Sequence, residues 1–187
     1  MLTRRRRWLA LGWTGFIFLF LWLWAPWAKY RYHGDGTFTD SGFFGYPRYR
    51  VHFASVSLSK VGEYRYRFRG LPGEEMSLLL SIDRDIAIES TQWHELTSLQ
   101  TTIEAVLTDG RGHEACKAVG SPEDNNRDGV WVLTTGFGTS YWHRRCTHVQ
   151  LHASQSYDLI LRIKAIDPRS GNLAVTPILE GGGIEFP

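Results

Sequence analysis

The sequence predicts an all-β protein, an antiparallel β-sandwich of the jelly-roll or immunoglobulin-like kind, preceded by one N-terminal transmembrane helix. Apolar and polar residues alternate with a period of two along much of the chain, and breakers containing Gly or Pro separate the short runs. The helix is predicted because residues 8–27 contain no charged residue and follow four consecutive arginines. A chain of 187 residues is long enough for one domain with a core.

The N-terminal segment is typical of a membrane anchor. Roughly 20 helical residues span about 30 Å, which is the thickness of a hydrocarbon core. A cleaved signal peptide is the alternative, but Pro26 stands where cleavage after Ala28 would need a small residue. We therefore expect a basic cytoplasmic segment at residues 1–7, a retained anchor at 8–28, and export of the remainder.

Residues 29–47 are rich in glycine, aromatic and turn-forming residues, which predicts a juxtamembrane linker with room for one edge strand. Residues 48–187 are expected to form the exported domain. Without the four leading arginines, the exported part has 17 Lys and Arg against 19 Asp and Glu, so no nucleic-acid partner is expected. The short basic N-terminus, the single anchor and the lack of glycosylation sequons favour a bacterial inner membrane, with the domain in the periplasm.

Eight runs of the exported part have strand periodicity. Two of them, RYRVHF at 48–53 and EYRYRFR at 63–69, place aromatic and aliphatic residues on one face and arginines on the other. The other six runs are residues 77–82, 102–107, 130–134, 147–151, 158–165 and 173–179. Turns such as Asp109-Gly110 separate the runs, and residues 98–107 have a weaker pattern that allows a helical turn at the start.

The runs VSLSKVGEYRYRFRG, YDLILRIKAID and NLAVTPILEGGG resemble parts of small exported bacterial β-sandwich domains. These domains include pre-peptidase-like and carbohydrate-binding-like modules and families of unknown function. The resemblance implies a fold and a compartment. It assigns no site residue, because no functional residue of those families can be matched to this sequence.

Cys116 and Cys146 are the only cysteines, and both lie in the exported part. An even pair in an oxidising compartment predicts a disulfide. In the chain-entropy model such a bridge, closing a loop of about 31 residues, stabilises the fold by about 3.5 kcal/mol.

The stretch DNNRDG fits the first six positions of a calcium-binding loop. Asp124, Asn126 and Asp128 would supply side-chain oxygens, and Gly129 would permit the sharp turn. The twelfth position is Thr135, however, so the bidentate acid of such loops is missing. The alternative is an Asp-Gly turn that leads into the following strand. No other cofactor is expected.

Arginines on two of the predicted strands define a candidate site for anions. If the two strands pair, the side chains gather on one sheet surface and require negative charge among them. An anionic ligand is one source of that charge, and acids on a neighbouring strand, such as Asp83, Asp85 or Glu104, are the alternative. The arginines are Arg48, Arg50, Arg65, Arg67 and Arg69.

A third candidate site consists of aromatic residues near a glycine-rich hairpin. Trp131, Tyr141 and Trp142 would stack on sugars if their rings were exposed. The alternative is that these rings fill the core at one end of a sheet.

The chain has no local signature of a nucleophile, a phosphate loop or a zinc helix. We therefore expect a non-catalytic binding module that contacts a protein partner within the cell envelope. One alternative is a module that binds an envelope glycan or lipid. Another is a calcium-dependent adhesion-type domain.

Overall fold

A computed structural model describes residues of one compact unit, which begins at Tyr32 and follows a separate N-terminal unit, Met1–Arg31. The described residues are 32–40, 48–82, 90–122, 130–134 and 139–182. The predicted anchor lies outside these ranges. Within them no helix is both long and apolar enough to cross a membrane.

Two antiparallel sheets make up the unit. Sheet 1 has five strands, in the order β1 (His33–Gly34), β5 (Gly62–Arg69), β12 (Ser156–Ala165), β7 (Thr102–Asp109) and β8 (Glu114–Gly120). Sheet 2 has the order β2 (Thr37–Asp40), β3 (Tyr49–His52), β13 (Ala174–Gly181), β6 (Glu75–Ile82), β10 (Ser140–Trp142) and β9 (Val132–Thr134). Two short strands complete sheet 2, β4 (Val56–Ser57) beside β13 and β11 (Val149–Gln150) beside β6.

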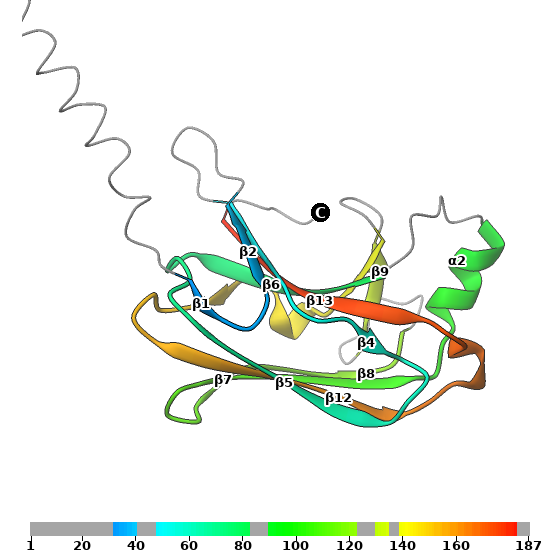
Figure 1. Cartoon of the computed structure of the whole chain (residues 1–187). Coiled ribbons are helices and arrows are strands. Elements are labelled where there is room, and N and C mark those ends of the chain that lie inside the picture. The colour runs from blue at the N-terminus through cyan, green and yellow to red at the C-terminus, as the bar shows by residue number, and fades with distance from the viewer. Residues whose placement is uncertain (1–31, 41–47, 83–89, 123–129, 135–138, 183–187) are drawn as a thin grey trace, which may run out of the picture. The chain divides into compact units, whose positions relative to one another are not determined.

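The sheets lie face to face, and their inner side chains form the core (Figure 1). Residue alternation explains this packing: β12 turns Tyr157, Leu159, Leu161 and Ile163 inward, and its outward-facing residues are charged or polar apart from Ile160. The helical elements of the described residues lie in connections between strands. They are α2 (Ser90–Thr97) and the 3₁₀ turns η2 (Arg144–Cys146) and η3 (Pro168–Ser170). The prediction of an all-β protein of antiparallel sheets is therefore confirmed.

The two sheets are linked to each other at both of their edges. On one side, the disulfide between Cys116 of β8 and Cys146 of η2 joins Cα atoms 5.4 Å apart, which confirms the predicted bridge. On the other side, β1 and β2 follow each other in the chain but belong to different sheets. The ring of Phe38 there stacks between Tyr32 and Tyr49, at centroid distances of 5.5 and 5.9 Å. Residues 33–40, predicted as linker, thus carry two edge strands.

All eight predicted strands are present, with ends that coincide or differ by at most two residues. The helical turn expected at the start of residues 98–107 is wrong, because α2 ends at Thr97 and β7 begins at Thr102. Strand β8 was not predicted, since its sequence EACKAVG has short side chains and little contrast between its two faces.

Loss of the disulfide should destabilise the domain without changing its fold. Replacing both cysteines with alanine is expected to lower the midpoint of thermal unfolding by about 10 °C, because the unfolded chain regains the freedom of the closed loop. Circular dichroism during heating would measure this. The wild type in reductant should have the same unfolding midpoint as the variant. A variant with the midpoint of the oxidised wild type would contradict the expectation.

Candidate functional site

The two arginine-bearing strands do not pair, so the prediction of a single arginine surface is wrong. Strand β3 belongs to sheet 2 and β5 to sheet 1, because the chain crosses between the sheets after β4 has paired with β13. Arg50 on β3 binds Glu180 of β13 at 2.7 Å, and Arg48 precedes the same strand. Only Arg65, Arg67 and Arg69 share a surface, which is the outer face of β5.

The outer face of sheet 1 is nevertheless rich in charge, and we call it the charged face. Its positive side chains are Arg65, Arg67, Arg69, Lys117, Arg162 and Lys164, and its negative ones are Glu63, Glu104, Glu114 and Asp158. These residues come from four adjacent strands of one sheet, so the backbone ladder fixes their spacing.

Glu104 is the centre of this network. Its side chain is only 6% exposed, and its oxygens lie 2.9 Å from Lys164 Nζ, 3.2 Å from Arg162 Nη1 and 3.7 Å from Lys117 Nζ. The hydrogen bond from Lys164, assisted by Arg162, holds the pKa of the Glu104 carboxyl below its usual range. A buried carboxylate with three cations around it leaves excess positive charge on the surrounding surface.

The arginines of β5 find acids on their own sheet. Arg65 Nε donates to Glu63 at 2.6 Å, and Arg67 Nε donates to Asp158 on β12 at 2.7 Å. Glu63 also accepts from Arg162 at 2.6 Å, which links this pair to the Glu104 network. The alternative of neutralisation by acids on a neighbouring strand therefore holds for Arg67, whereas Arg65 binds an acid of its own strand and Glu104 binds other cations.

The other acids of that alternative, Asp83 and Asp85, lie outside the described residues. Sequence reasoning also missed Asp158, Arg162 and Lys164. The alternation in DLILRIKA places all three on the polar face of one strand, and that signal was sufficient to find them.

Two of the three candidate stacking residues face the core, so the alternative that these rings fill the core holds for them and they do not stack on sugars. Trp131 and Tyr141 are fully buried. Trp131 Nε1 donates to the Ile103 carbonyl at 3.1 Å, and the Tyr141 hydroxyl donates to the Leu96 carbonyl at 2.9 Å. Trp142, the next residue on β10, points to the outer face of sheet 2 and is half-buried.

The predicted calcium ligands, Asp124, Asn126 and Asp128, lie outside the described residues. In the part of the chain that the structure describes, no group of three or more His, Cys, Asp or Glu side chains could hold a metal ion.

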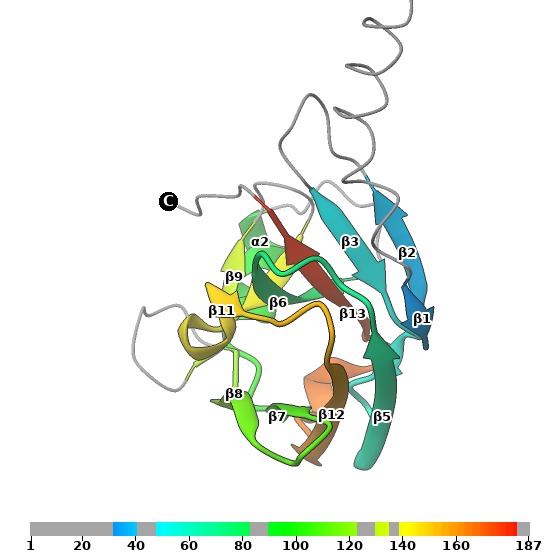
Figure 2. The same ribbon diagram turned by 90° about the vertical axis from the view of Figure 1, so that its left-hand side faces the viewer.

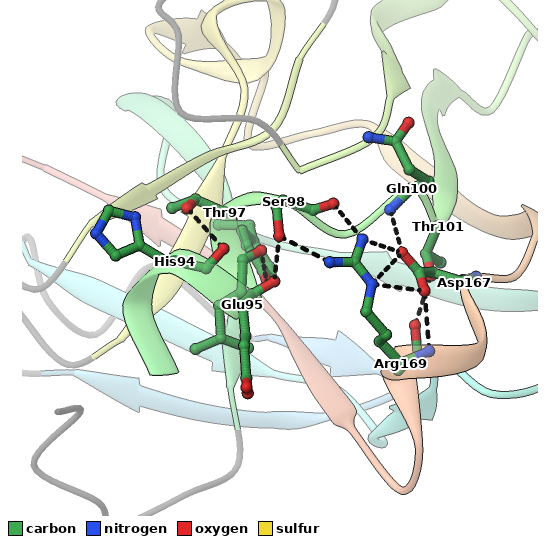
Figure 3. Close-up of polar contacts among 11 residues, drawn as sticks. His94, Glu95, Thr97, Ser98, Gln100, Thr101, Asp167 and Arg169 are labelled. Atoms are coloured by element: carbon green, nitrogen blue, oxygen red, sulfur yellow. Dashed lines mark hydrogen bonds and ion pairs between the residues drawn. The ribbon is translucent and has the colours of Figure 1, made fainter. Parts of the chain in front are cut away.

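A second polar cluster joins η3 to the end of α2, and we call it the Asp167 clip (Figure 3). Arg169 reaches across to the Ser98 carbonyl at 2.7 Å and binds the Asp167 carboxylate at 2.6 Å. The same carboxylate accepts the backbone N–H of Gln100 at 2.9 Å. The Asp167 N–H donates to the Thr101 hydroxyl at 3.0 Å.

The Asp167 clip positions α2 and does not form a reactive group. The Ser98 hydroxyl lies 3.0 Å from Arg169 Nη1 and donates to the Glu95 carbonyl, so no base activates it. Arg169 is the largest cause that holds the pKa of the Asp167 carboxyl well below its usual range. No sequence signal pointed to this clip, because its partners lie about 70 residues apart along the chain.

Comparison of the chain with protein-family models, with curated proteins and with solved structures finds no match. The resemblance to exported β-sandwich modules thus remains an expectation from the sequence.

Trp131 and Trp142 should respond differently to mutation. Trp131→Phe is expected to destabilise the domain by about 1–3 kcal/mol, because the Ile103 carbonyl loses its buried donor and the smaller ring leaves space. Trp142→Phe, on the half-buried position, should cost under about 1 kcal/mol. Urea unfolding followed by circular dichroism measures both. Equal losses would contradict the different burial of the two rings.

Asp167 should make stability depend on pH. Its pKa is lowered on folding, so its contribution is present above about pH 4 and is lost as pH falls further. We expect Asp167→Asn to melt below the wild type at pH 7, and the difference to shrink between about pH 5 and pH 2.

The control for this experiment is Glu114→Gln, because Glu114 makes no ion pair among the described contacts. The melting temperature of this variant should follow that of the wild type at every pH. A gap between Asp167→Asn and wild type that stays constant over this pH range would contradict the charge argument.

Proposed function

We propose that the chain is a non-catalytic binding module, anchored in a bacterial inner membrane by residues 8–28, whose periplasmic domain binds an envelope protein through the charged face. The observation that carries the proposal is a fixed pattern of both charge signs on an open sheet surface. Arg65 and Arg67 are 69% and 79% exposed there.

The two outer faces of the domain differ in accessibility. On sheet 2 the outward-facing residues Leu79, Ile178 and Glu180 are nearly inaccessible, at 8% exposure or less. On sheet 1 the side chain of Glu104 on the central strand β7 is nearly buried too, but the outward-facing side chains of β5 are exposed along the whole strand. This contrast supports sheet 1 as the surface that a partner reaches.

The mixture of charges favours a protein over other anionic partners. Cations outnumber carboxylates on the charged face by six to four, so it attracts negative surfaces. Asp158 and Glu63 would meet uniform negative charge unfavourably in a lipid headgroup layer or a nucleic acid. A protein surface can match both signs in register, and such matching gives specificity and a fast association rate.

The length of the tether also favours a partner at the membrane. Only residues 29–32 separate the predicted anchor from β1, and four residues extend at most about 14 Å. Holding a domain this close to a bilayer raises the effective concentration for weak contacts with neighbouring membrane proteins.

The test is mild crosslinking of the full chain in the membrane, followed by purification and mass spectrometry. We expect one heterologous protein in a constant ratio to the chain. Capture of a glycan or lipid without a protein would overturn the proposal.

Charge reversal then tests the surface. Arg69→Glu and Lys117→Glu, at opposite edges of the charged face, should each weaken the crosslinked complex by about tenfold. Arg69 makes no ion pair among the described residues, so its reversal leaves the fold unchanged. Arg111→Glu, in the β7–β8 turn, has the same charge change away from the face and should have no effect. Equal loss in all three variants would contradict a specific surface.

A further inference from the structure

Strand β5 has an open edge over more than half of its length. Strand β1 pairs only with Phe68 and Arg69, and Asp35 then exchanges two hydrogen bonds with the backbone of Arg67, at 2.7 and 2.8 Å. Residues 62–66 pair with β12 on one side, and within the described ranges no strand pairs with their other side (Figure 2).

The backbone groups at this edge can be identified from the register. In an antiparallel strand the N–H and C=O of one residue point to the same side, and the sides alternate along the chain. Arg67 directs both groups to Asp35, so Arg65 and Glu63 direct theirs to the same open side. Four ladder groups are therefore available to an added strand.

A two-fold rotation that brings two copies of this edge together places side chains of opposite charge opposite each other. If a second β5 lies antiparallel with Tyr64 at the centre, Glu63 of each copy faces Arg65 of the other. The two hydrogen-bonding residues then face each other, as the ladder requires. Tyr64, which is half-buried at the rim of the core, faces its own equivalent.

We propose that two copies of the chain pair through the open edges of β5, so that their five-stranded sheets form one continuous sheet. The charges select this register. A pair centred on Glu63 would bring two carboxylates face to face, which is unfavourable. A pair centred on Arg65 would bring two arginines face to face, and it would also need the backbone groups of Arg67, which Asp35 already occupies. Charged residues on an edge strand often prevent pairing altogether. Here the same charges disfavour the registers centred on residues 63 and 65, and they favour the register centred on Tyr64.

The contact is short, so its strength depends on concentration. Four backbone hydrogen bonds and two opposite-charge pairs make a small interface of the weak, transient kind. Two copies anchored in one membrane would meet at a high effective concentration, and the pairing should be measured with the full chain in membranes.

A cysteine at position 64 tests the register directly. Tyr64 forms a pair without mutual hydrogen bonds across the two-fold axis, where Cα atoms are about 4.5 Å apart and a disulfide can form. We expect Tyr64→Cys to give a covalent dimer under mild oxidation, seen on non-reducing gels. Arg67→Cys is the matched control, because Arg67 has no charged residue opposite it and an offset of six residues places its copies about 20 Å apart, beyond disulfide reach.

Charge exchange tests the selection of this register. Arg65→Glu in the Tyr64→Cys chain should reduce the covalent dimer at least tenfold, and adding Glu63→Arg should restore it. Arg67→Glu, on the same strand but with no charged residue opposite, should leave the yield unchanged. Thermal melting shows that each variant is folded.

Three results would overturn the proposal. They are no covalent dimer from folded Tyr64→Cys chains in membranes, equal crosslinking at positions 64 and 67, or a dimer yield that does not change when the charge at position 65 is reversed.

Discussion

The packing of two sheets around one core fixes the direction of nearly every side chain in this domain. Once Tyr66 and Phe68 point into the core, Arg65 and Arg67 must point to solvent, because successive residues of a strand face opposite sides. The surface chemistry of sheet 1 is thus a geometric consequence of burying the other half of each strand. Burial of apolar area provides most of the favourable free energy.

The charged face has a different energetic character. Its exposed pairs contribute little stability one by one, since water and salt screen them. Glu104 is the exception, because a nearly buried carboxylate must keep cationic partners. Fixed charges of this kind are better suited to selecting a partner than to holding the fold together.

Sequence reasoning predicted the fold class and most strands, because alternation is a local signal that EYRYRFR and DLILRIKA carry clearly. It failed where the answer depends on which strands are neighbours. Strands β3 and β5 have similar patterns and lie close in the chain, yet the short strand β4 between them pairs within sheet 2 and takes the chain across. Trp131 was ambiguous for the same reason, since the composition of a hairpin does not show which face a ring occupies.

The first strand of the domain also determines how the domain bears mechanical load. A pulling force that enters through Tyr32 acts first on β1, which holds β5 by two paired residues, and then on the two hydrogen bonds between Asp35 and the backbone of Arg67. Detaching β1 and Asp35 would release residues 33–36, at most about 14 Å of chain, before force reaches β2 and the stacked ring of Phe38. The core would remain intact during that extension. Residues 33–36 therefore form a segment that can detach under load before the core is pulled apart.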